Sequence, residues 1–126
     1  MNTKIILTSK APAPIGPYSQ AIDTGSFIFI SGQIPLDAKT GNIVGSTIEE
    51  QAEQALKNLT AILESQSMSA QNLVKTTVFI KSMADFPVFN SIYEKALNGH
   101  KPARSVVEVS CLPKNVMVEI EAIAWR

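Results

Sequence analysis

The segment Val116-Met-Val-Glu-Ile-Glu-Ala-Ile-Ala-Trp125 decides the fold, because its apolar residues recur with a period of two. Such alternation is typical of a β-strand with two different faces. One parity is wholly apolar and consists of Val116, Val118, Ile120, Ala122 and Ala124. The other, made of Met117, Glu119, Glu121, Ile123 and Trp125, is too apolar for simple solvation and too charged for a core. We expect this second face to form an interface or a pocket, the alternative being an open face with scattered exposed apolar residues.

Upstream patterns predict the elements that surround this strand. Strands are indicated at 18–22, 27–31, 73–80 and 104–111, and the first two form a hairpin around Asp23-Thr-Gly-Ser26. The 73–80 segment is mostly apolar on both parities and rich in Val and Thr, so we expect it to be covered on both sides. A helix at 47–66 begins with capping-box spacing in Thr47-Ile-Glu-Glu50. A second helix at 84–97 has its apolar face at Phe86, Phe89, Tyr93 and Ala96.

The resulting order, ββαβαββ, predicts an α+β fold with a single mixed β-sheet and both helices on one face. With 126 residues, 45% of them hydrophobic, residues 1–126 are expected to form one domain. Basic and acidic residues balance at 11 each, which argues against binding nucleic acid or anionic lipid. The first ten residues contain only three consecutive apolar ones, far fewer than a signal or membrane segment needs, so we expect no membrane association and a cytoplasmic location.

The chain offers little for metal or cofactor chemistry. His100 is the only histidine and lies in a predicted loop, so no zinc site is expected. We find no glycine-rich phosphate loop and no serine in a nucleophile elbow, and we therefore expect no cofactor. Cys111 cannot form an internal disulfide, which fits a reducing cytosol, and we expect it to pack as a core thiol at the end of the 104–111 strand.

Two residues indicate a pocket for a small carboxylic acid. Arg104 stands at a strand start, where its guanidinium can present a planar fork of donors to a carboxylate. Glu119 lies on the mixed face of the last strand and can orient a water molecule. Glu121 is about 7 Å from Glu119 along a strand, too far to share one proton, so the two carboxylates need separate roles. The alternatives are a surface ion pair for Arg104 and charge pairing of the glutamates at a subunit contact.

Three motifs carry a resemblance in their order and spacing: Ala13-Pro-Ile-Gly-Pro-Tyr-Ser-Gln-Ala21, Ser31-Gly-Gln-Ile-Pro35 and Pro102-Ala-Arg-Ser105. Over nearly its whole length the chain resembles the YjgF/YER057c/UK114 family of imine and enamine deaminases, also called reactive intermediate (RidA) deaminases. The resemblance implies a chorismate-mutase-like fold. It also implies a homotrimer whose sheets pack inward and whose active sites lie in clefts between subunits.

The resemblance implies roles for individual residues. Arg104 matches the arginine that binds the substrate carboxylate, and Glu119 matches the residue that holds the attacking water. Tyr18 matches a tyrosine at the cleft, although a tyrosine packed at a hairpin edge explains it too. Asn90 matches a position that lines the pocket, and an asparagine on a helix is also often simply exposed.

Three further positions are expected to bind substrate. Ser31-Gly32 ends a strand with a residue that lacks a side chain, which allows a ligand close to the backbone, and a plain strand end explains it equally well. Val106 stands where similar proteins often have cysteine. Its backbone carbonyl can still accept a hydrogen bond, so we expect this departure to change pocket shape and redox sensitivity more than mechanism.

The predicted function is a hydrolytic deaminase that converts small imino or enamine acids, 2-iminobutanoate and 2-iminopropanoate, to 2-oxo acids and ammonia. One alternative is a regulatory protein that senses 2-oxo acids through the same arginine without turnover. Another is an RNA-cleaving translation inhibitor, which the charge balance and the lack of a basic-aromatic patch disfavour.

Overall fold

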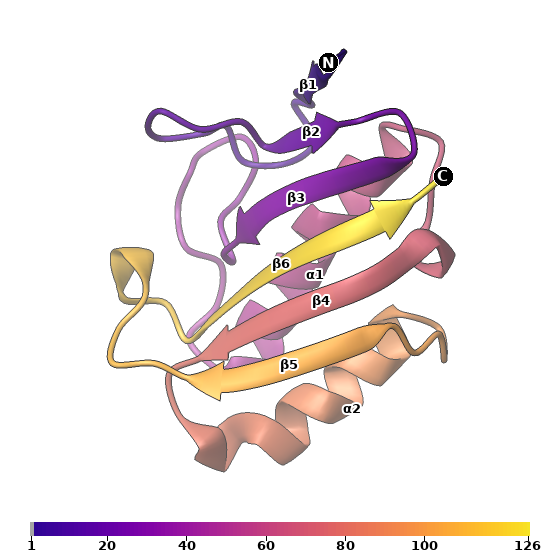
Figure 1. Ribbon diagram of the computed structural model, residues 1–126. Coiled ribbons are helices and arrows are strands. Elements are labelled where there is room, and N and C mark those ends of the chain that lie inside the picture. Colours follow the sequence, from indigo (N-terminus) through magenta and orange to yellow (C-terminus); the bar gives the residue numbers. More distant parts are fainter. Residues whose placement is uncertain (1) are drawn as a thin grey trace.

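Six strands form one mixed sheet in the order β1-β2-β3-β6-β4-β5 (Figure 1). The computed structural model describes residues 2–126. The strands are β1 (Lys4–Ile6), β2 (Ala21–Asp23), β3 (Phe27–Gln33), β4 (Leu73–Ile80), β5 (Ala103–Glu108) and β6 (Val118–Trp125). The helices are α1 (Ile48–Glu64) and α2 (Phe86–Ala96), with short 3-10 turns η1 (Ala70–Asn72), η2 (Met83–Asp85) and η3 (Pro113–Asn115). All neighbouring strands are antiparallel except β4 and β5, which are parallel.

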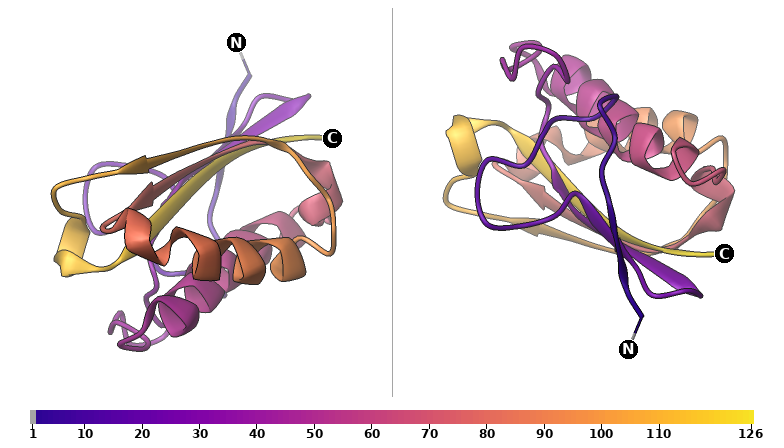
Figure 2. Two further views of the ribbon diagram at one scale, coloured as in Figure 1. Left: turned by 90° about the horizontal axis from the view of Figure 1, so that it is seen from below. Right: turned by 90° about the horizontal axis from the view of Figure 1, so that it is seen from above.

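Both helices cover the same face of the sheet, as Figure 2 shows from two directions. The α+β class, the mixed sheet and the predicted order of elements are confirmed, with β1 added at the start. Helix α1 begins at the predicted capping box, in which Thr47 Oγ1 accepts from Glu50 N and Glu50 Oε1 accepts from Thr47 N. Its apolar stripe is buried, as is the predicted inward parity of β6 from Val118 to Ala124. No helix among residues 2–126 is long and apolar enough to cross a bilayer.

The ends of several elements differ from the sequence-based expectation, and the first strand of the predicted hairpin lies at Ala21–Asp23 and not at 18–22, so that Tyr18 belongs to the preceding loop. Strand β1 was not predicted, because three residues at an edge give too short a pattern, yet it pairs with β2 and buries Ile6. Strand β5 ends at Glu108 and not at 111, because β4 ends at the paired Ile80 and offers no further partner. The prediction that Cys111 is a core thiol is therefore wrong: it lies exposed in the loop beyond β5.

The apolar face of α2 also differs slightly from the prediction. Phe89 and Tyr93 are buried as expected, but Ala96 is exposed, and Leu97 at the end of the helix is buried in its place. The last turn is followed by Asn98 and Gly99 with positive φ, which carry the chain away from the helix axis.

The face of the sheet opposite the helices has no covering layer within one chain. Its aromatic residues Phe27, Phe29 and Trp125 are 41%, 47% and 58% exposed, an unusual density of large apolar groups for a solvated surface. Strand β4 follows the same pattern, since Val78 and Ile80 are buried whereas Thr77 and Phe79 are only partly covered. The expectation that β4 is covered on both sides is thus not met by a single chain.

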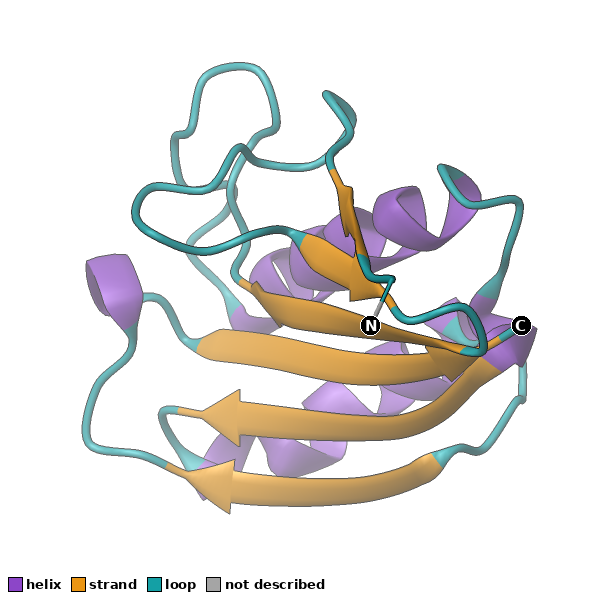
Figure 3. Cartoon of the chain, turned by 45° about the horizontal axis from the view of Figure 1, so that its top comes forward, coloured by secondary structure: helices purple, strands orange, loops and turns teal. Residues whose placement is uncertain are grey.

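A buried glutamine fixes the loop that runs between β1 and β2. Gln20 Nε2 donates to the carbonyl oxygens of Thr8, Ala11 and Pro12, at 3.0, 3.3 and 2.9 Å, and Gln20 Oε1 accepts from Thr8 N at 2.7 Å. A buried amide whose hydrogen bonds all go to one loop holds the backbone of that loop in a single conformation. Figure 3 shows this loop and the loop after β3, both teal, at one end of the sheet.

Candidate functional site

The loops at this end of the sheet enclose a cavity of about 500 Å³. The loop held by Gln20, the end of β3, the turn η3 and the start of β6 all contribute to its wall. We call it the glutamate cavity; its lining residues are Pro12, Ala13, Ile15, Tyr18, Gln20, Ser31, Gly32, Gln33, Ile34, Leu36, Pro113, Lys114, Glu119 and Glu121. The volume is ample for a ligand of a few carbon atoms.

Glu119 is the half-buried carboxylate of this cavity. Burial raises the pKa of Glu119 above its ordinary value, and the nearby Glu121 carboxylate raises it further. Among residues 2–126 we find no hydrogen bond donated to the Glu119 carboxylate. Its oxygens are therefore available to a water molecule, and its pKa is moved towards neutrality, as suits a proton-transfer group.

Gly32 makes room for this carboxylate. The register between β3 and β6 shifts between Ile30 and Gln33, which marks an irregularity beside Ser31-Gly32. A Cβ atom at Gly32 would lie 2.7 Å from Glu119 Cδ and closer still to one carboxylate oxygen. Ser31 is fixed by its Oγ, which donates to Ser19 O at 2.6 Å. A side chain at position 32 would push the carboxylate out of place, whereas a ligand contact at Ser31 or Gly32 stays a prediction.

Tyr18 lies at the mouth of the glutamate cavity. Its side chain is exposed, and its hydroxyl accepts a hydrogen bond from Ile15 N at 3.3 Å within the same loop. The structure thus brings Tyr18, Ser31, Gly32 and Glu119 together around one cavity.

Arg104 belongs to a separate group of residues between β5 and α2, which we call the arginine cluster: Arg104, Asn90, Phe86 and Tyr93. Arg104 Nη1 donates to Asn90 Oδ1 at 2.9 Å, and Arg104 Cζ lies 4.8 Å from the ring centroid of Tyr93 and 5.5 Å from that of Phe86. The alternative of a surface ion pair is not found, since the one ion pair within residues 2–126 joins Arg126 to Asp23. Within the described residues, Arg104 is therefore a cation that contacts two aromatic rings and an amide and has no carboxylate at ion-pair distance.

The two groups lie on opposite faces of the sheet. Arg104 pairs in register with Thr76, and Thr76 pairs with Ala122, three residues from Glu119 on β6. Two strand spacings and three residues of offset put the Cα atoms of Arg104 and Glu119 roughly 14 Å apart. Val106, half-buried, shares the helix-facing parity of β5 with Arg104. Within one chain, Arg104, Asn90 and Val106 are thus brought near one another but away from Glu119.

Sequence reasoning missed the aromatic half of the arginine cluster. Phe86 and Tyr93 were assigned to the core face of α2 alone, although their spacing from Asn90 places all three along one side of the helix. That i, i+4, i+7 pattern beside a strand that carries Arg104 was the available signal.

No metal centre is found within the described part of the chain, where no group of three or more His, Cys, Asp or Glu side chains converges. His100 Nε2 instead lies 2.8 Å from Leu73 O, which ties the loop before β5 to the start of β4.

We predict that Glu119→Gln stabilises the protein at neutral pH. A raised pKa in the folded state means that ionisation of the carboxylate costs stability as the pH rises above the unfolded pKa, in full above the folded pKa, and the neutral amide removes this cost. The unfolding temperature at pH 7 should rise by about 1–3 °C, a small gain because solvent screens a half-buried group. The gain should vanish below about pH 4, where the carboxyl group is protonated in both states.

Thermal unfolding followed by circular dichroism at pH 7 and pH 3.5 checks this prediction. Glu94→Gln, which changes an exposed carboxylate on α2, is the matched control and should produce no such gain. An unfolding temperature for Glu119→Gln at or below that of the wild type at pH 7 would contradict the prediction.

Known proteins are similar to this chain over almost its full length. Residues 8–126 match the family model described as Endoribonuclease L-PSP. A RutC family protein of Pyrococcus horikoshii is 52% identical over 98% of both chains, and a protein of Salmonella typhimurium named 2-iminobutanoate/2-iminopropanoate deaminase is 50% identical over 98% of both. The solved structure of E. coli TdcF with bound serine superposes with a TM-score of 0.92 at 44% identity, covering 98% of each chain. The chain therefore belongs to the Endoribonuclease L-PSP family, which is the YjgF/RidA family that its sequence motifs indicate.

Proposed function

We propose that this protein is a cofactor-free hydrolase that converts 2-imino acids, such as 2-iminobutanoate and 2-iminopropanoate, to 2-oxo acids and ammonia. The name of the Salmonella relative, at 50% identity over nearly the full length, supports this activity. The serine bound to the E. coli relative is a small molecule with a carboxylate, of the size that this site would take. We further propose a cytoplasmic location, where the exposed thiol of Cys111 would stay reduced.

The observation that carries the proposal is the pair of unsatisfied charged groups. Within the described residues, Arg104 makes no ion pair and a single hydrogen bond, to Asn90, so most of its donors are free for a carboxylate. Glu119 has a raised pKa, and no group among residues 2–126 donates a hydrogen bond to its carboxylate. A cation without an anion and a carboxylate without a donor are the two groups that hydration of a bound imino acid requires.

These groups can meet one substrate only if they come from different chains. Arg104 faces α2 at the outer edge of the sheet, whereas Glu119 faces the opposite side. We therefore propose a homotrimer in which the open sheet faces pack inward, with Arg104 of one subunit beside the glutamate cavity of the next. The exposed Phe27, Phe29 and Trp125 supply the apolar surface that such an interface buries.

In the proposed reaction, Arg104 binds the substrate carboxylate through paired hydrogen bonds and so fixes the C=N group relative to Glu119. A water molecule held by Glu119 adds to the imine carbon and gives one proton to the carboxylate, and Glu119 passes this proton to the nitrogen as the C=N double bond opens. In the resulting tetrahedral species Glu119 then takes the hydroxyl proton as C=O forms and delivers it to the nitrogen as the C–N bond breaks, which releases ammonia and restores the carboxylate. A pKa raised towards neutrality suits a group that accepts and then donates.

Substrates of this kind arise when pyridoxal-phosphate enzymes dehydrate serine or threonine and release enamines that tautomerise to imines. Removal of these electrophiles before they react with other proteins would be the physiological role. Ile15, Ile34 and Leu36 give the glutamate cavity an apolar wall suited to a short aliphatic tail.

A regulatory protein that binds 2-oxo acids would use the same Arg104 without turnover. Saturable binding of 2-oxobutanoate combined with no deaminase rate would favour that alternative. The description of the family model raises RNA cleavage, but the 11 basic and 11 acidic residues give no net attraction for a phosphate backbone. Salt-sensitive binding of RNA by the pure protein would revive it.

We predict that Arg104→Ala abolishes the acceleration of imine hydrolysis while the fold survives. Two lost hydrogen bonds to a charged group, at about 1.5–3 kcal/mol each, correspond to a fall in kcat/KM of about 10²–10⁴-fold. Arg104→Lys should recover little, because a point charge cannot reproduce the planar fork. The assay follows 2-oxo acid formation from imine generated in situ by a dehydratase, with semicarbazide as the competing trap.

The matched control is Arg126→Ala, which removes the other arginine, held in an ion pair with Asp23 at 2.8 Å, and should leave the rate unchanged. Equal rates for the wild type, Arg104→Ala and a sample without protein would refute the enzyme and leave the binding protein as the better account.

We also predict a trimer, with three times the 13.6 kDa chain mass by light scattering at micromolar concentration. Phe29→Glu should dissociate it and remove activity, because a charge would then be buried on the open sheet face. Val88→Glu, a similarly exposed apolar residue on α2, is the control and should leave the mass unchanged. A monomeric wild type would contradict this prediction, because the proposed site would then lack the residues that a neighbouring subunit contributes.

A further inference from the structure

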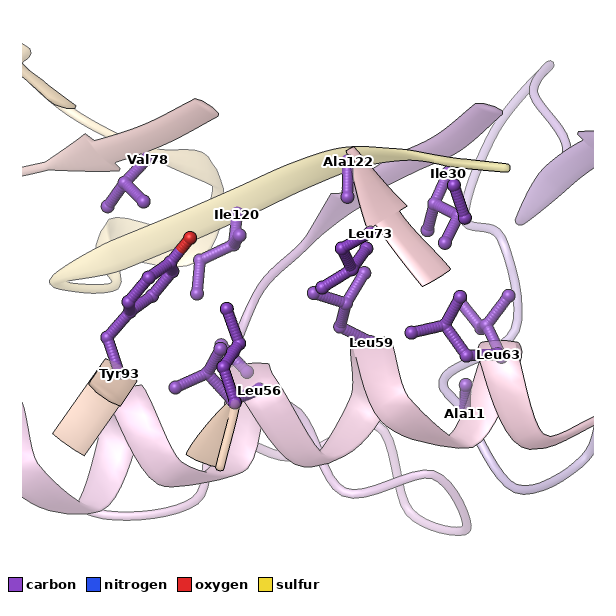
Figure 4. Packing of buried hydrophobic residues seen from close by; sticks show 14 of the residues in the cluster. Ala11, Ile30, Leu56, Leu59, Leu63, Leu73, Val78, Tyr93, Ile120 and Ala122 are labelled. Carbon is purple, nitrogen blue, oxygen red and sulfur yellow. The ribbon is translucent and has the colours of Figure 1, made fainter. Parts of the chain in front are cut away.

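Tyr93 makes a contact that a residue serving the core alone would not need. Its ring rises from α2 with the hydroxyl group turned towards the sheet (Figure 4). There the hydroxyl oxygen lies 2.6 Å from Thr76 Oγ1, in a buried hydrogen bond between two side chains. Thr76 is fully buried on β4 and is the register partner of Arg104 on β5. The ring of Tyr93 is thus tied to the strand position directly beside Arg104.

The guanidinium of Arg104 lies over a face of the same ring. Arg104 Cζ lies 4.8 Å from the Tyr93 centroid, and Phe86 adds a second ring at 5.5 Å. An aromatic face attracts a cation through its quadrupole and favours a guanidinium held against it. Burial raises the pKa of the Tyr93 phenol, so the hydroxyl stays protonated and keeps its bond to Thr76.

These neighbours orient Arg104 without neutralising it. A carboxylate partner would hold the guanidinium as firmly, but it would also compete with an anionic ligand for the charge and the donors. Two aromatic faces and the amide oxygen of Asn90 restrict the side chain and leave the positive charge available. An arginine on an edge strand otherwise has many rotamers open to it.

We propose that Tyr93, anchored by Thr76, is a positioning residue that fixes the plane of the Arg104 guanidinium for bidentate capture of a substrate carboxylate. The effect of Tyr93 on turnover rests on the proposed function. The orientation of Arg104 by Tyr93 does not depend on that function. The two parts are tested separately, so that failure of one is distinguishable from failure of the other.

The first test needs no ligand. The order parameter of the Arg104 Nε–H group, from 15N relaxation, should be about 0.8 in the wild type and below about 0.6 in Tyr93→Leu. Tyr93→Phe and Thr76→Val each break the hydroxyl contact and should give intermediate values. The variant that combines Tyr93→Phe with Thr76→Val should have an order parameter no lower than that of either single variant, because both changes remove the same hydrogen bond.

Leu97→Ala is the matched control for loss of stability. Leu97 is buried one turn after Tyr93 at the end of the same helix, so its truncation lowers the unfolding temperature while both rings that contact Arg104 remain in the chain. The order parameter should stay at the wild-type value. An unchanged order parameter in Tyr93→Leu, or an equal loss in Leu97→Ala, would overturn the proposal.

The second test links positioning to turnover. In Tyr93→Leu, KM for the imine should rise about tenfold while kcat stays within about threefold, because Arg104 contacts the carboxylate in both the ground state and the transition state. Leu97→Ala should leave KM unchanged. Turnover with an unchanged KM in Tyr93→Leu would overturn the role of Tyr93 in catalysis. A wild type without turnover, in which the order parameter still falls on Tyr93→Leu, would overturn the proposed function and uphold the positioning of Arg104.

Discussion

The two-sidedness of β6 is the constraint on which the rest of the structure depends. Its inward parity is buried, with α1 packed against it, whereas its outward parity carries Glu119, Glu121 and Trp125 on a face with no cover in the single chain. Side chains alternate between the two faces of a strand, so a shift of β6 by one residue would turn its apolar residues outward and its glutamates inward together. The buried core and the position of the carboxylates are therefore decided by the same eight residues.

The candidate site uses charges that the protein leaves unsatisfied. Glu119 is half-buried beside a second carboxylate, with Gly32 making the space it occupies, and this arrangement costs stability at neutral pH. Arg104 is held by neutral groups on the other side of the sheet. The Glu119 arrangement is unfavourable for a folded chain considered alone, and in the proposed function both groups serve one small anionic substrate that lies between them. This is the trade of stability for activity expected of an active site.

The periodic elements of this fold were predictable from sequence, and the contacts between them were not. The start of α1 follows from its capping box and β4 from its run of apolar residues, because both signals are local. The end of β5 depends on where β4 stops, so the exposure of Cys111 could not be read from its own neighbourhood. Arg104 and Glu119 could be identified from sequence as candidate site residues. Their positions on opposite faces of the sheet follow from the register of three strands. The link from Thr76 through Tyr93 to Arg104 joins distant segments and needs the packed structure.

The central claim is that Arg104 and Glu119 act on one substrate from neighbouring subunits, and a complementation experiment tests it most directly. Arg104→Ala and Glu119→Gln chains, each inactive alone, are co-expressed and purified as mixed assemblies. If each site takes Arg104 from one chain and Glu119 from the next, random mixing restores about a quarter of the wild-type sites, and deaminase activity returns in that proportion. Mixed assemblies with no more activity than either parent would contradict the shared site.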